Sequence, residues 1–191
     1  MVREQNGPAV LRRTSLLLPT LIVTLLIAGC AAMSEEECRH ADWHEQGMRD
    51  ALAGHRVSRM DALREACAKA GVVPDAQQYR AGWTQGIQQF CTPEHGAYWG
   101  RQGRSYADSC PAALEPGFLG PYQAGRRLHA AETQIDQLQR EQDRLQRQLE
   151  KAKENAQRQQ LRRQLRELDD KLSMARQELN RAESDFRRWG H

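Results

Sequence analysis

The spacing of apolar positions divides this 191-residue chain into three parts. A nearly unbroken apolar run, Leu16 to Ala28, follows two arginines and ends at Gly29-Cys30. The next part, up to about residue 127, mixes apolar positions with many glycines and aromatics. From residue 128 to 188 apolar residues recur every three or four positions, which is the period of an amphipathic helix. The pattern therefore predicts an N-terminal targeting segment, a small domain and a long helical extension.

The extension carries two heptad seams that are out of phase with one another. The first spans residues 128–156 and is interrupted once, at Gln142; the second spans residues 161–186 and is displaced by about two residues. The polar stretch 153–160 lies between them. Two arms of nearly equal length predict an antiparallel helical hairpin over residues 128–188.

Such a hairpin would return Trp189 to the neighbourhood of Leu128, with residues 189–191 as a tail. One continuous helix that dimerises or trimerises stays open as the alternative, because neither Gly nor Pro marks a turn and only Asn155 favours one. The continuous helix would reach about 90 Å and the hairpin about 45 Å, at 1.5 Å per residue.

Short helices that pack closely through glycines are expected in residues 38–127. A glycine followed three or four residues later by another small residue or an acid, with an aromatic close to it, occurs four times, at Trp43, Tyr79, Tyr98 and Tyr122. Small residues at this spacing share one helix face and allow another backbone to approach, whereas glycine costs a helix about 1 kcal/mol relative to alanine. Gly54 and Gly71 are expected to end helices, and Pro74-Asp75 to begin one that runs toward Phe90.

The apolar run predicts a bacterial lipoprotein signal peptide over residues 1–29, with Cys30 as the lipidated first residue and residues 30–37 as a tether. The run has about 13 residues and contains Pro19, whereas a membrane-spanning helix needs about 20. Ala31 stands where an Asp would signal retention in the inner membrane. We therefore expect a lipid anchor at the periplasmic face of the outer membrane, with the lipid on Cys30 as the only covalent group and no cofactor.

Composition supports the same division. Residues 47–125 hold 11 of the 14 glycines, and residues 43–122 hold 9 of the 11 aromatics. The net charge of +3 falls to +1 once residues 1–29, with three Arg and one Glu, are removed. A nearly neutral chain does not indicate a nucleic-acid partner.

Four cysteines besides Cys30 lie in the small domain: Cys38, Cys67, Cys91 and Cys110. An even number in a protein that faces the periplasm predicts two disulfides. Three pairings are possible. We favour Cys38 with Cys67, which would join the start of one helix to the end of the next in an antiparallel hairpin, and Cys91 with Cys110. The second pairing requires a bend in residues 93–108, because a straight helix of that length would hold its ends about 24 Å apart.

An ordered set of cysteine, glycine, aromatic and acidic residues spans this domain: Cys38, Asp42, Trp43, Gly47, Asp50, Gly54, Cys67, Gly71, Asp75, Tyr79, Gly82, Gly86, Phe90, Cys91, Gly100, Gly103, Tyr106, Cys110, Pro111, Tyr122 and Gly125. The set resembles the uncharacterised bacterial lipoprotein family known as domain of unknown function 2799, over about residues 38–127. Two departures are mild: Ala51 stands where the family often has Gly, and Phe90 where Tyr is common. The resemblance implies an envelope lipoprotein with a helical extension and implies no activity.

The sequence lacks the His-Glu-x-x-His, Gly-x-Ser-x-Gly, Cys-x-x-Cys and phosphate-binding Gly-rich motifs of familiar enzymes. Cys38, His40 and His44, with His55 nearby, have spacing that could suit a metal, but a cysteine in a disulfide cannot ligate one. We therefore expect no metal site.

A candidate cluster for binding a cell-wall sugar or peptide lies among the glycines of the small domain and consists of Asp50, Asp75 and Arg101. The structural interpretation is that Asp75 caps a helix, while Asp50 and Arg101 form an ion pair with each other.

The sequence thus predicts an all-α protein with a disulfide-stapled small domain and a coiled-coil hairpin. We expect a non-enzymatic, lipid-anchored interaction or tethering protein, which meets a protein partner or a second copy through residues 128–188. The alternative is a module that binds an envelope ligand, peptidoglycan or a metal, through the small domain.

Overall fold

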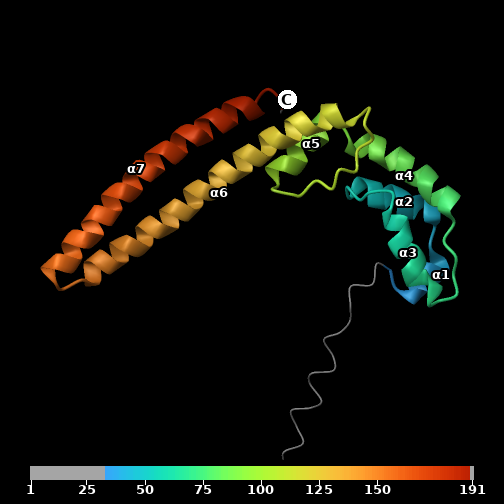
Figure 1. Ribbon diagram of the computed structural model, residues 1–191, viewed down its shortest axis with the longest axis horizontal. Coiled ribbons are helices and arrows are strands. Elements are labelled where there is room, and N and C mark those ends of the chain that lie inside the picture. The colour runs from blue at the N-terminus through green and yellow to red at the C-terminus, as the bar shows by residue number, and fades with distance from the viewer. Residues whose placement is uncertain (1–32, 190–191) are drawn as a thin grey trace, which may run out of the picture.

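The structure is a computed structural model and describes residues 33–189. The expected signal peptide and the lipidation site Cys30 lie outside these residues. The described chain contains helices and no strand, which confirms the all-α prediction (Figure 1). The helices are α1 (Glu35–His40), α2 (Trp43–Leu52), α3 (Arg59–Ala68), α4 (Ala76–Phe90), α5 (Pro93–Arg101), α6 (Glu115–Lys151) and α7 (Asn155–Phe186).

The helix boundaries follow from local chemistry. The Asp75 carboxylate accepts hydrogen bonds from the backbone N–H groups of Gln77 and Gln78, at 2.9 and 3.0 Å, and so begins α4 as expected. Gly54 and Gly71 follow α2 and α3 with φ of 78° and 67°, the left-handed conformation that glycine adopts most readily. Both predicted helix ends are therefore confirmed.

Helices α2 and α4 pack backbone against backbone. The Cα of Gly82 faces the main chain of His44, and that of Gly86 faces Met48, so the contacts advance in the same direction and the two helices run parallel. Gly47 makes the reciprocal approach to Tyr79. The glycine phrases thus mark the places where the two helix axes come close.

Helices α5 and α6 repeat this arrangement. Gly96 faces Phe118, Gly100 faces Tyr122, and Gly125 faces Ala97 in return, so this pair is also parallel. The small domain is therefore two glycine-packed helix pairs in succession.

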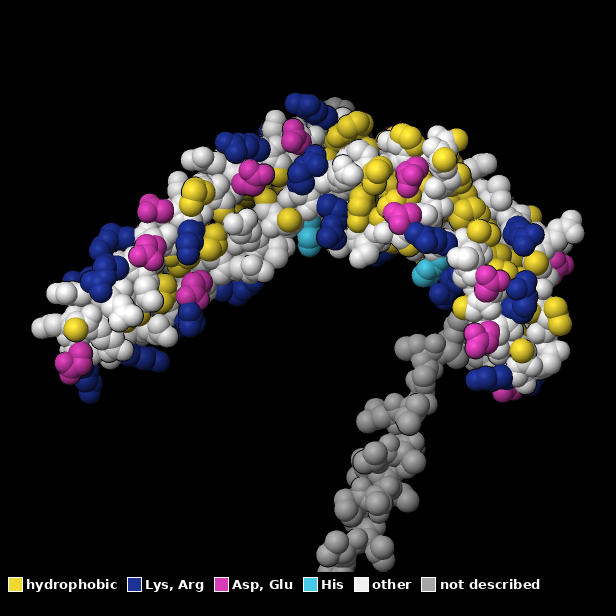
Figure 2. All heavy atoms as spheres, in the orientation of Figure 1, with side chains coloured by type: hydrophobic (Ala, Val, Ile, Leu, Met, Phe, Trp, Pro, Cys, Tyr) yellow, Lys and Arg dark blue, Asp and Glu magenta, His cyan; other side chains and the backbone are white. Residues whose placement is uncertain are grey.

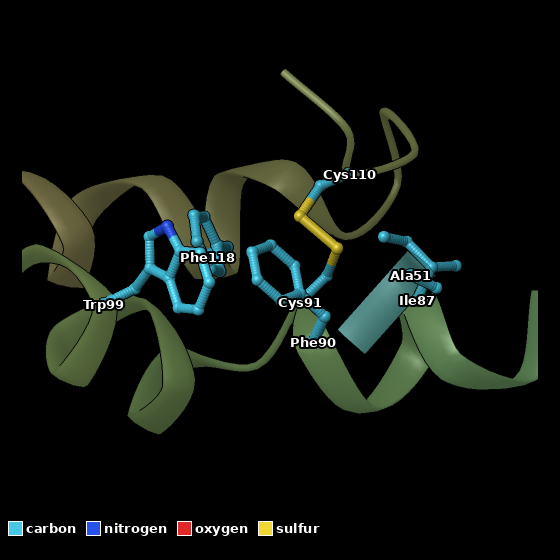
Figure 3. Close-up of a cluster of buried hydrophobic side chains, with 7 residues drawn as sticks. All are labelled: Ala51, Ile87, Phe90, Cys91, Trp99, Cys110 and Phe118. Carbon is cyan, nitrogen blue, oxygen red and sulfur yellow. A yellow bond between two sulfur atoms is a disulfide. The ribbon is translucent and has the colours of Figure 1, made fainter. Parts of the chain in front are cut away.

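An aromatic core joins the two pairs (Figure 3). Phe90, at the end of α4, stacks on Phe118 of α6 and meets the edge of Trp99 of α5, both at 5.1 Å between ring centroids. Ala51 and Ile87 bring the α2–α4 pair into the same cluster. Aromatic pairs at these distances stabilise a core beyond the area they bury.

Both favoured disulfides are present, Cys38–Cys67 and Cys91–Cys110. The required bend is present too, because α5 ends at Arg101 and an irregular segment leads to Cys110. The reason given for the first pairing was wrong: Cys38 lies in α1 and is joined to the end of α3, with α2 between them in the sequence.

The extension is an antiparallel hairpin, as predicted. Residues 152–154 separate α6 from α7, and Leu145 packs with Leu168 inside a shared apolar cluster. Gln142, which interrupts the first seam, donates a hydrogen bond of 2.8 Å to Asp169 across the hairpin. At the other end Leu128 and Ala131 pack against Ala182, with Phe186 beside them.

Helix α6 begins inside the small domain and continues without a break past residue 127, where the sequence suggested a boundary. Trp189 returns to α6 as expected, although it lies against Gly120 and beside Gln123, about one to two turns before Leu128. The hairpin is therefore a rigid continuation of the domain rather than an appendage on a linker. The described chain forms an arch, with α1 and α3 at one foot and the α6–α7 turn at the other (Figure 1).

Candidate functional site

The three residues of the expected ligand cluster have separate structural roles. Asp75 caps α4, as the structural interpretation predicted. Asp50 pairs with Arg59 and Arg101 pairs with Glu132, so the predicted Asp50–Arg101 ion pair is wrong. The topology places Asp50 in the α2–α4 pair and Arg101 in the α5–α6 pair.

Asp50 is a buried carboxylate, 5% exposed, with three side-chain partners. It accepts hydrogen bonds from the hydroxyl of Tyr79 at 2.8 Å, the amide of Gln46 at 3.0 Å and the guanidinium of Arg59 at 3.2 Å. Burial, with the adjacent carboxylate, raises the pKa of Tyr79 and keeps its hydroxyl protonated as a donor. This network fixes α2 against α3 and α4 and leaves little of Asp50 open to a ligand.

The residues of the candidate metal site also have separate structural roles. Cys38 is in a disulfide, His40 contacts Glu36 at 3.0 Å on the exposed face of α1, and the backbone of His44 packs on Gly82. Within residues 33–189 no group of three or more His, Cys, Asp or Glu side chains is placed to hold a metal ion.

A depression on the described surface lies between α1 and α2. It has a volume of about 530 Å³ and is lined by Met33, Glu37, His40, Ala41, Asp42, Glu45, Gln46 and Arg49. Its charged groups already have partners on their own helices: Glu37 accepts bonds from Ser34, and Arg49 pairs with Glu45. The backbone N–H of Ser34 lowers the pKa of Glu37. These local bonds account for the polar residues without a ligand.

His95 lies against the aromatic core, with ring centroids 4.7 Å from Phe90 and 5.4 Å from Trp99. Its Nε2 is buried without a hydrogen-bond partner among the described residues, and burial lowers the pKa of His95. The neutral imidazole therefore serves here as a flat packing group.

The hairpin offers the most extended exposed surface. Its seam is closed, because Leu168, Leu172 and Ala175 of α7 are buried, while the outward positions of both helices carry charged and amide side chains. Figure 2 shows both signs of charge over this face, with apolar side chains gathered near the middle of the arch. Met174, 62% exposed, is a large apolar side chain on the outward face of α7.

One residue that sequence reasoning missed ties the hairpin to the domain. Glu132 of α6 receives two hydrogen bonds from the guanidinium of Arg101, which is 31 positions earlier, in α5. Such a bidentate pair fixes orientation as well as distance. No local sequence signal connects the two positions, because their meeting depends on the parallel packing of α5 on α6.

No helix among the described residues combines the length and apolarity that a membrane span requires.

Comparisons with known proteins concern the small domain. Residues 42–127 match the family model described as "Protein of unknown function (DUF2799)". The "Uncharacterized protein YfiL" of Escherichia coli (strain K12) is 27% identical over 95 residues, which cover 47% of this chain and 71% of that protein. No solved structure matches the chain. The resemblance drawn from the sequence is confirmed over residues 42–127, which match the model of the DUF2799 family and make up less than half of the chain.

Proposed function

We propose that this protein is a lipid-anchored, non-enzymatic interaction protein of the bacterial envelope, which presents its helical hairpin to a protein partner. The proposed anchor is a lipid on Cys30 at the periplasmic face of the outer membrane. Several acyl chains, at about 0.8 kcal/mol per buried methylene, make such attachment effectively permanent. Confinement to a thin layer raises the effective concentration of partners, so a modest interface suffices.

The observation that carries the proposal is the rigid projection of the hairpin. Beyond the Arg101–Glu132 pair, α6 packs on α7 alone among the described residues, and both helices expose their outer faces. Two disulfides and two glycine-packed helix pairs hold the base from which it projects. A rigid presenting element lowers the entropy lost on binding.

The observations favour this function over the envelope-ligand alternative. The candidate ligand cluster of that alternative was Asp50, Asp75 and Arg101, and each of these residues has its own structural partner. Replacing the outward residues of α7 distinguishes the two functions. Loss of partner binding would indicate that the hairpin carries the function, whereas an unchanged association with the envelope would indicate that the small domain carries it.

Photocrosslinking in living cells tests the proposal. Crosslinking amino acids at Met174 and Gln177, both exposed on α7, should capture the same second protein, identified by mass spectrometry. A probe at the exposed Glu65 of α3 is the matched control and should not capture it. If only a second copy of this chain is captured, the hairpin mediates self-association and does not bind a different protein. Capture from Glu65 but from neither α7 position would contradict the proposal.

A further inference from the structure

The charges of the hairpin are segregated along its length. Residues 145–166, which we call the basic tip, contain seven Lys or Arg and two Glu, a net charge of +5. The rest of the hairpin, residues 128–144 and 167–188, contains seven Lys or Arg and ten Asp or Glu, a net charge of −3. The nearly neutral total therefore conceals a strong concentration of positive charge at one end.

Among the described residues, the basic side chains of the tip have no carboxylate partners, whereas three of the seven basic side chains elsewhere in the hairpin have one. Ion pairs join Arg144 to Glu141, Arg181 to Glu178 and Arg188 to Asp185, all outside the tip. Within the described chain none of the seven basic side chains of the tip pairs with a carboxylate, and six of them are exposed. Three of them, with Gln159, line one shallow depression: Arg162, Arg163 and Arg166.

Helix stability explains only part of this placement: Lys151 lies in the last turn of α6, where a basic side chain is favourable, but the remaining basic residues are not placed in this way. The tip includes the first turns of α7, where the helix dipole is positive and basic side chains are unfavourable. No acidic side chain lies in the first turn of α7, and no side chain caps it. Arg158 thus adds positive charge to the positive end of α7, which increases the attraction of that end for anions.

The arch directs the basic tip to the same side of the molecule as the N-terminal foot (Figure 1). Met33 packs with Met60 and Leu63 in the core of that foot. Three residues of chain span at most about 10 Å, so a lipid on Cys30 would hold this foot at the membrane. A membrane under one foot is then within reach of the other.

We propose that the basic tip docks on anionic phospholipid headgroups of the membrane that holds Cys30, so that the protein stands on two feet. This inference rests on the proposed lipid anchor. A lipid surface fits the tip because basic side chains are attracted to anionic headgroups without an apolar contact. This attraction contributes about 1 kcal/mol for each Lys or Arg near the surface. A protein interface has an apolar centre, and the exposed large apolar residues of the described chain all lie outside residues 145–166.

The test uses the mature lipoprotein in vesicles, with a fluorescent amino acid at Asn155, the first residue of α7, and an acceptor on a fraction of the lipid headgroups. We expect energy transfer in phosphatidylethanolamine–phosphatidylglycerol vesicles, reversed by added salt, and little transfer in vesicles of phosphatidylethanolamine and phosphatidylcholine. Replacing Arg147, Arg162, Arg163 and Arg166 by Gln should lower the docking equilibrium constant at least about tenfold. The matched control is Gln at Arg176, Arg181, Arg187 and Arg188, which removes the same charge outside the tip and should leave docking intact.

The outcomes separate this proposal from the anchor on which it rests. Attachment to neutral vesicles reports the anchor, whereas energy transfer from Asn155 reports the tip. If the chain does not bind neutral vesicles but binds anionic ones through the tip, the proposal of a Cys30 anchor is wrong and the proposal of tip docking is supported. Energy transfer equal in the two lipid mixtures, or equally reduced by both sets of substitutions, would overturn the proposal. Tip-dependent binding to isolated peptidoglycan without docking on anionic vesicles would also overturn it, and would assign the tip to the wall polymer.

Discussion

Replacing Gly82 by alanine is expected to lower the free energy of unfolding by about 3 kcal/mol or more. A Cβ at this position would overlap the carbonyl oxygen of His44 and lie 2.7 Å from its carbonyl carbon. Both atoms belong to the backbone of α2, so no side-chain rotation relieves the overlap and the α2–α4 pair must separate. Denaturant unfolding of the disulfide-bonded protein, followed by circular dichroism, measures the effect.

Gly117 provides the matched control because it is also a helical glycine. A Cβ there meets no atom within 4 Å, and its alanine variant should gain about 0.5–1 kcal/mol from helix propensity. Opposite signs for the two variants are therefore expected. Equal losses at Gly82 and Gly117 would mean that glycine acts through chain flexibility, and would contradict the close packing of α2 on α4.

Replacing Asp50 by alanine should cost about 3–5 kcal/mol. The truncation leaves the Arg59 guanidinium without its carboxylate and the buried Tyr79 hydroxyl without its acceptor. Asn at position 50 keeps an acceptor for Tyr79 and should cost less. Thermal or denaturant unfolding measures the effect. The free energy of unfolding should be lowest for Asp50→Ala, intermediate for Asp50→Asn and highest for the unaltered protein.

Asp75→Ala is the control for Asp50→Ala, because it removes a helix cap and not a buried network. Asp75 accepts only local backbone bonds at the start of α4, so its loss should cost about 1 kcal/mol. An Asp50→Ala variant as stable as Asp75→Ala would show that Asp50 does not hold the helices together. It would then become a candidate ligand group again.

Features set by nearby residues were predictable from the sequence. Asp75 and Gly71 mark a helix start and a helix end by their own backbone chemistry, and the seam of leucines in residues 161–186 indicates the buried face of a helix. The turn at residues 152–154 was predictable from the phase shift between the seams, although no Gly or Pro occupies it. The favoured cysteine pairing was correct, while the helices it joins were misidentified.

Features set by distant residues were not predictable in the same way. Tyr79 meets Asp50 from 29 positions away because α3 returns the chain so that α4 runs parallel to α2. Arg101 meets Glu132 only because α5 and α6 are also parallel. The loss of glycine after residue 125 suggested a boundary near 127, yet α6 continues through it, because composition changed with solvent exposure rather than with secondary structure.

The most direct test of the central proposal, a lipid-anchored envelope protein, is the mass of the mature N-terminus. The protein is purified from membranes in detergent and analysed intact and after proteolysis. The proposal predicts a chain that begins at Cys30 and carries the mass of a diacylglycerol and an acyl chain, with Cys30→Ala abolishing both the cleavage and the added mass. A membrane-associated chain that begins elsewhere, or one that begins at Cys30 without lipid, would contradict it.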